Sequence, residues 1–127
     1  MNEKIPIRIV VGGLNKDAIA RVVKLVGGEN VIVEVMSDFE AAKKIKEGGA
    51  DYYFGACNSG GGAALSIPIG ILGYTKCATV AKAGGRPKAD EIEKLVRDGK
   101  IAFGMSVETI DEAVPMLVKS ILKKHGI

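Results

Sequence analysis

Short runs of β-branched residues alternate along the chain with longer segments whose apolar residues recur every three or four positions. The short runs are typical of buried parallel strands, and the longer segments are typical of helices with one apolar face. Strands are expected at 5–11, 31–35, 51–55, 75–81 and 101–104, and helices at 16–26, 38–47, 63–72, 87–98 and from Ser106 or Thr109 onward. The alternation predicts one α/β domain over residues 1–127, with a parallel sheet covered by helices on both faces.

This alternation favours a doubly wound, Rossmann-like sheet with the flavodoxin-like strand order 2-1-3-4-5. In that order the winding direction reverses between the first and third strands, and ligands bind outside the carboxyl ends of the strands at such a point. The turn after the first strand contains Gly12, Gly13 and Asn15, and the turn after the third contains residues 57–62. We therefore expect these two turns to face each other.

Helix boundaries are marked by capping and stop residues. Ser37 followed by Glu40 forms a capping box at the start of the second helix, whose buried stripe is expected to contain Phe39, Ala42 and Ile45. Two glycines end this helix before the third strand begins.

The third strand leads into a glycine turn and an apolar helix, and this stretch holds the candidate site. It reads ADYYFGACNSGGGAALSIPIGILGY over residues 50–74, and no charged side chain lies between Asp51 and Lys76. Glycines allow backbone N–H groups to point into one space, and a helix N-terminus adds partial positive charge. The pattern predicts a site for an anionic oxygen, formed by Asn58, Ser59, Gly60, Gly61 and Gly62. The alternative is that the glycines only allow tight packing between strand and helix, and that no ligand binds. The turn matches neither a dinucleotide-binding fingerprint nor a P-loop.

Cys57 and Arg86 are the candidate reactive and charged residues. Cys57 follows the third strand directly, where it would act as a base, a nucleophile or a phosphoryl acceptor, or else pack as a small buried hydrophobe. Arg86, in the loop after the fourth strand, is a candidate contact for an anion. No pair of carboxylates stands near these turns, which weakens a hydrolase interpretation.

Composition narrows the class of protein further. The chain is 47% hydrophobic, 26% charged and 5% aromatic, its net charge is only +3, and its lysines are spread over the predicted helices. This is not the pattern of a nucleic-acid-binding protein. No early apolar run resembles a signal peptide, and the two cysteines lack the spacing of a zinc site or a disulfide framework. We expect a cytoplasmic protein that uses no metal and no cofactor.

The helix expected at 63–72 is apolar on nearly all sides. A helix that covers one face of a sheet normally has a polar outer face. Its sequence therefore predicts a homo-oligomer in which a second copy covers this helix.

Four segments along the chain resemble the YhfU-like bacterial family, which is small, glycine-rich and of unknown function. They are VVGGLNKDAIA, VMSDFEAA, DYYFGACNSGGGAALSIPIGILGYTKCATV and AVPMLVKSIL. Members of that family are typically encoded near a predicted membrane transporter and enzymes of small-molecule metabolism. The resemblance implies uptake or use of a small metabolite, with a membrane transporter as a partner.

A second resemblance is local. The run YYFGACNSGGGAALS is similar to the strand, cysteine and glycine turn of the ribose-5-phosphate isomerase B and galactose-6-phosphate isomerase family. It implies that Cys57 acts as a base and that the backbone from Ser59 to Gly62 holds an enediolate oxygen. The chain departs from that family after the first strand, where Gly12-Gly13-Leu14-Asn15 replaces an Asp-His pair, and it lacks the family's ring-opening histidine.

The expected function is therefore binding of a small anionic or phosphorylated metabolite, as an accessory to transport or catabolism. The alternative is an aldose–ketose sugar-phosphate isomerase that uses Cys57 as its base. A scaffold without a ligand is the third option.

Overall fold

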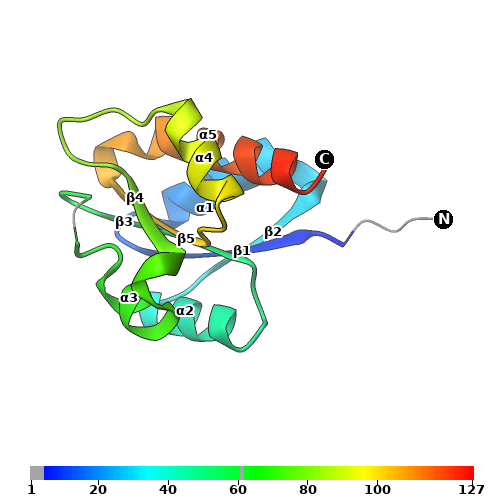
Figure 1. Cartoon of the computed structure of the whole chain (residues 1–127), viewed down its shortest axis with the longest axis horizontal. Helices are drawn as coiled ribbons and strands as arrows, with labels where there is room; N and C mark the ends of the chain where they lie inside the picture. The colour runs from blue at the N-terminus through cyan, green and yellow to red at the C-terminus, as the bar shows by residue number, and fades with distance from the viewer. Residues whose placement is uncertain (1–4, 61) are drawn as a thin grey trace.

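The computed structural model describes residues 5–60 and 62–127, in which five parallel strands lie between two layers of helices (Figure 1). The strands are β1 (Ile7–Gly13), β2 (Val31–Val35), β3 (Tyr52–Cys57), β4 (Cys77–Ala81) and β5 (Ala102–Ser106). The α-helices are α1 (Lys16–Gly27), α2 (Asp38–Lys46), α3 (Ser66–Leu72), α4 (Ala89–Arg97) and α5 (Ile110–Lys124). Single 3₁₀ turns precede β2, β4 and α5 at Gly28–Asn30, Tyr74–Lys76 and Val107–Thr109. The predicted doubly wound α/β class is confirmed.

The strand order is β2-β1-β3-β5-β4, so the predicted order 2-1-3-4-5 is wrong in its last two strands. Parallel crossovers are right-handed, which means that the direction of each step across the sheet decides which face its helix covers. The steps through α2 and α3 run toward β4 and place these helices on one face. The step through α4 runs back from β4 to β5, so α4 joins α1 and α5 on the other face (Figure 1). The winding still reverses between β1 and β3, as expected.

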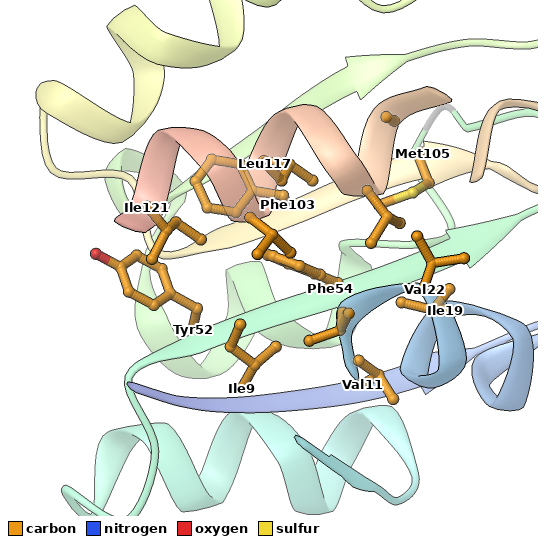
Figure 2. Packing of buried hydrophobic residues seen from close by; sticks show 14 of the residues in the cluster. Ile9, Val11, Ile19, Val22, Tyr52, Phe54, Phe103, Met105, Leu117 and Ile121 are labelled. Atoms are coloured by element: carbon orange, nitrogen blue, oxygen red, sulfur yellow. The ribbon is translucent and has the colours of Figure 1, made fainter. Parts of the chain in front are cut away.

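The larger of two cores lies between the sheet and helices α1, α4 and α5. Phe54 of β3 and Phe103 of β5 meet edge to face, with ring centroids 6.1 Å apart. Figure 2 shows side chains from α1 and α5, including Ile19, Leu117 and Ile121, packed around them. Burial of this branched aliphatic surface is the main favourable contribution to folding.

The smaller core lies under α2 and α3. It combines Val10, Tyr53 and Ala102 of the sheet with residues of the covering segments, among them Ile45 and Leu65. Side chains alternate between faces along a strand, so Tyr53, Gly55 and Cys57 all lie on this second face. Cys57 therefore belongs to the thinner side of the molecule.

The start of α2 agrees with the predicted capping box, but its buried stripe does not. The Ser37 hydroxyl accepts the Glu40 N–H at 3.1 Å and donates to the Glu40 carboxylate at 2.9 Å. Phe39, predicted to be buried, is 55% exposed. The buried arc is centred on Ala41, Ala42 and Ile45, and at about 100° per residue Phe39 points away from that arc.

Helix α3 begins at Ser66 and not at residue 63 as predicted. Residues 63–65 form a turn closed by a hydrogen bond from Leu65 N–H to the Gly62 carbonyl at 3.1 Å. The Leu65 side chain lies directly over Gly104, where an added Cβ would be 2.8 Å from Leu65 Cγ. This contact holds the turn flat on the sheet and leaves only seven residues for the helix. In the described ranges, no helix combines the length and the apolar character that a membrane span requires.

Candidate functional site

The end of β1 and the first residue of its turn lie against the end of β3. That the two glycine turns face each other across a ligand stays a prediction. The Leu14 N–H donates to the Ala56 carbonyl at 2.9 Å. Gly13 has a φ of 75°, and a Cβ at this position would be 2.5 Å from the Ala56 oxygen. Glycine is therefore needed here for close approach of the two backbones.

The other two predicted residues of the β1 turn differ in exposure. Gly12 is buried beneath the start of α2, where an added Cβ would be 3.0 Å from the Asp38 nitrogen. Asn15 is exposed, has a left-handed φ of 53°, and occupies the N-cap position of α1 without a capping hydrogen bond from its side chain. Of the two, Asn15 is the one whose side chain is exposed, and its predicted contact with a ligand stays a prediction.

The glycine loop after β3 crosses the end of β5 and reaches β4. Gly60 is buried with a φ of 71°, and an added Cβ would lie 2.4 Å from the Ala81 oxygen and 2.6 Å from the Ser106 nitrogen. The Ser59 carbonyl accepts the Ala83 N–H at 2.8 Å. Asn58, Ser59 and Gly62 are exposed, and an added Cβ at Gly62 would meet nothing. Gly61, also predicted to be part of the site, lies outside the described residues.

The loop amides point at the sulfur of Cys57. This side chain is buried, and its Sγ accepts the Gly60 N–H at 3.1 Å, with the Ser59 hydroxyl 3.8 Å away. Burial raises the pKa of the Cys57 thiol, but hydrogen bonds from the Ser59 hydroxyl and from the backbone N–H groups of Gly60, Ala64 and Ser59 outweigh it, so the pKa lies below its ordinary value. Donors predicted to hold the oxygen of a ligand thus hold the protein's own sulfur, which favours a thiolate.

The buried hydroxyl of Tyr53, two residues before Gly55 on β3, lies on the same face of the sheet as Cys57. The Tyr53 side chain extends over Gly55, where an added Cβ would be 2.2 Å from the hydroxyl oxygen. This oxygen is buried and has no hydrogen-bond partner in the described part of the chain. Burial, and then the charges of Asp38, Cys57 and Cys77, raise the pKa of Tyr53, so the phenol stays neutral. Tyr53 was not among the predicted site residues, although strict alternation along β3 places it on the face of Cys57.

Arg86 lies on the β4–α4 loop and faces the start of α5. Its Nη2 is 2.8 Å from the Glu112 carboxylate, and the nearby Gly84 N–H donates to Glu108 at 2.6 Å. These residues line a hollow of about 290 Å³. The Arg86 guanidinium is thus paired with a carboxylate of α5, and its predicted contact with an anion stays a prediction.

The single histidine lies at the other end of the sheet. His125 Nε2 is 2.9 Å from the hydroxyl of Tyr52, the first residue of β3, whereas Cys57 is the last. Within residues 5–60 and 62–127, no three His, Cys, Asp or Glu side chains gather as metal ligands would. The site as described is therefore built from a thiol, uncharged polar side chains and backbone amides.

Comparison with known proteins gives the family. A family profile described as "Protein of unknown function DUF2620" matches residues 7–121, from the start of β1 into the last turns of α5. This chain belongs to that family. It is also 45% identical over 111 residues to "Uncharacterized protein YhfU" of Escherichia coli (strain K12), a match that covers 87% of this chain and 95% of the relative. The relative of the same name from Shigella flexneri matches equally well.

The family assignment confirms the resemblance found in the sequence. Because the DUF2620 description and the names of these relatives state no activity, any function has to be argued from the site itself. The local likeness to sugar-phosphate isomerases stays a prediction.

Proposed function

We propose that this chain binds a small metabolite at the carboxyl edge of its sheet and that Cys57 is the reactive group of the site. The supporting observation is the Gly60 N–H aimed at Cys57 Sγ at 3.1 Å, in a loop whose amides favour the thiolate. A thiolate is a nucleophile and a base, whereas a buried neutral thiol is neither.

The surroundings suit a ligand rich in oxygen. Asn58, Ser59 and Asn15 are exposed at the same edge and offer amide and hydroxyl groups without a net charge. Polar groups of this kind orient hydroxyl, carbonyl, carboxylate or phosphate oxygens. Since several loop amides already hold the sulfur, a metabolite that reacts with Cys57 accounts for the site better than an anion bound by amides alone.

Two activities fit this arrangement. In the first, the thiolate removes a proton from the hydroxyl-bearing carbon next to a carbonyl group and returns it to the carbonyl carbon, while the hydroxyl proton passes to the carbonyl oxygen, as in an aldose–ketose isomerisation. In the second, the chain holds an anionic or phosphorylated metabolite for a transport or catabolic partner without turnover. The lowered pKa of Cys57 favours the first activity, because a binding protein needs no thiolate.

A ligand screen tests the proposal. Sugar phosphates, phosphonates, carboxylates and inorganic phosphate are added to the purified protein, and a compound that binds only the folded state raises the melting temperature with concentration. Each compound that binds is then assayed for isomerisation with the wild type, with Cys57→Ser, and with Cys77→Ser as the control for loss of a buried thiol.

The outcomes separate the two activities. Turnover that disappears in Cys57→Ser and persists in Cys77→Ser supports the isomerase. Binding without turnover in all three proteins supports the accessory role. If no compound raises the melting temperature at millimolar concentration, the proposal of a metabolite site fails.

A further inference from the structure

The strand order places β2 and β4 at opposite edges of the sheet, and the two edges differ in their protection. An edge strand presents backbone N–H and C=O groups that can pair with another chain, and an irregular register or nearby lysines hinder such pairing. The register of β4 shifts between Thr79 and Ala81, and Lys76 and Lys82 flank the strand. By contrast, β2 pairs with β1 at all five of its residues without a shift, and it contains neither lysine nor proline. The edge at β2 is therefore the one open to a further strand.

The direction of the backbone groups of β2 follows from the hydrogen bond that comes just after it. The Met36 N–H donates to the Val11 carbonyl at 3.0 Å, so it points toward β1. Backbone groups of successive residues in a strand point to alternate sides, so every second residue before Met36 also faces β1. The remaining residues of the strand direct their N–H and C=O groups to the open edge. They are Val31, Val33 and Val35.

The side chains of β2 also suit burial against another strand. Ile32 is 47% exposed and Val35 is 39% exposed, although both are apolar. Glu34 is the one charged residue of the strand, and its carboxylate forms an ion pair with Lys44 of α2. The edge therefore combines exposed apolar surface with a charge that already has a partner, whereas protected edges carry lysines.

We propose that β2 pairs with β2 of a second copy of this chain, antiparallel and about a two-fold axis at Val33, so that two five-stranded sheets become one of ten strands. In this register Val33 pairs with the same residue of the partner, and Val31 pairs with the partner's Val35. All the outward N–H and C=O groups of the three valines then form hydrogen bonds between the two copies.

A second copy fits this edge because the edge is complementary to itself. The valines of both copies form one apolar row on the face covered by α1, beside the larger core that Val31 and Val33 already contact. On the other face Ile32 lies opposite the partner's Glu34, so the two Glu34 carboxylates are not directly opposite each other.

The proposed interface leaves the candidate site accessible. Cys57 ends β3, and β1 lies between β3 and the paired edge. Because the strands of the two copies run in opposite directions, their carboxyl edges lie at opposite sides of the ten-stranded sheet. Each copy therefore keeps its own Cys57 loop, and neither loop is covered by the partner.

Opposite charges introduced at Ile32 test the register. Sedimentation equilibrium of the wild type should give a mass that rises from one chain to two with concentration. Ile32 is exposed, so Ile32→Lys and Ile32→Glu should both fold, which urea unfolding checks. In the dimer the lysine would face the partner's Glu34, whereas the glutamate would face it as a like charge, and each contact occurs twice. We expect the Kd of Ile32→Glu to be about tenfold above that of Ile32→Lys.

Amide hydrogen exchange measured by NMR tests the backbone pairing itself. Exchange at Val31, Val33 and Val35 should slow as the protein concentration rises, because their N–H groups are bonded only in the dimer. The amides of Ile32 and Glu34 face β1 and should be protected equally at every concentration. This alternation along one strand is the signature of pairing through the open edge of β2.

Three results would overturn the inference. The first is a wild type that stays a single chain at every concentration. The second is a dimer whose Kd is the same in Ile32→Lys and Ile32→Glu but which Ile67→Lys dissociates, since this would assign the second copy to α3. The third is a dimer in which the valine amides of β2 exchange as fast as in the single chain.

Discussion

Separate replacement of Gly60 and Gly62 tests whether the loop after β3 packs closely against the ends of β4 and β5. Gly60→Ala forces a side chain into a left-handed conformation, which costs about 1–2 kcal/mol. Its Cβ would also lie 2.4 Å from the Ala81 oxygen and 2.6 Å from the Ser106 nitrogen. Both are backbone atoms that cannot move aside freely, and overpacking of this kind adds about 1–3 kcal/mol. We expect Gly60→Ala to lower the free energy of unfolding by about 2–5 kcal/mol.

Gly62→Ala is the matched control in the same loop. An added Cβ at Gly62 would meet no atom within 4 Å. The substitution should leave stability unchanged or raise it by up to about 1 kcal/mol through the unfolded chain. Urea unfolding of the three proteins, followed by circular dichroism, gives the comparison. Equal stability of the two variants would refute the close contact between the loop and the ends of β4 and β5.

Three further predictions concern the rest of the molecule. Burial raises the pKa of Asp51, but hydrogen bonds from Arg8 outweigh it, so the pKa of Asp51 in the folded protein is lowered. The stability that Asp51 contributes is therefore present above its unfolded-state pKa and is lost as pH falls through its folded-state pKa. Asp51→Asn should make the free energy of unfolding depend less on pH in the acid range. Leu117→Ala, at a fully buried position of α5, should destabilise the protein by about 2–5 kcal/mol in urea unfolding. If a second copy covers α3, Ile67→Lys should reduce the molecular mass measured by light scattering, whereas Leu25→Lys, on the exposed surface of α1, should not. An unchanged mass in both variants would contradict an interface through α3.

Periodicity predicted the elements well and their spatial order only in part. Each strand and helix was found within a few residues of its predicted range, because apolar spacing records which face is buried. The exchange of β4 and β5 was missed. The stripe of Ile92 and Val96 on α4 shows that this helix has a buried face, but it does not say which side of the sheet the helix covers. That choice decides the order of the last two strands.

The sequence pointed to the loops of the candidate site but not to the contacts inside them. Glycine-rich turns were found at the ends of β1 and β3, as predicted. The sequence could not show that the amides around Gly60 point at Cys57, because that direction depends on the left-handed φ of a single glycine. The sequence also could not show that the loop packs against β5, because this packing depends on the strand order.

The pH dependence of alkylation shows whether the loop favours the thiolate of Cys57. Iodoacetamide rates at Cys57 and Cys77 are measured in one sample, so that Cys77, whose pKa is raised by burial, serves as the internal control. Thiolate attack gives a rate that rises with pH through a midpoint at the pKa of the thiol and then levels off. We predict a midpoint for Cys57 below the ordinary thiol value of about 8.5 and a midpoint for Cys77 above it. A midpoint for Cys57 at or above that of Cys77 would show that the loop does not stabilise the thiolate.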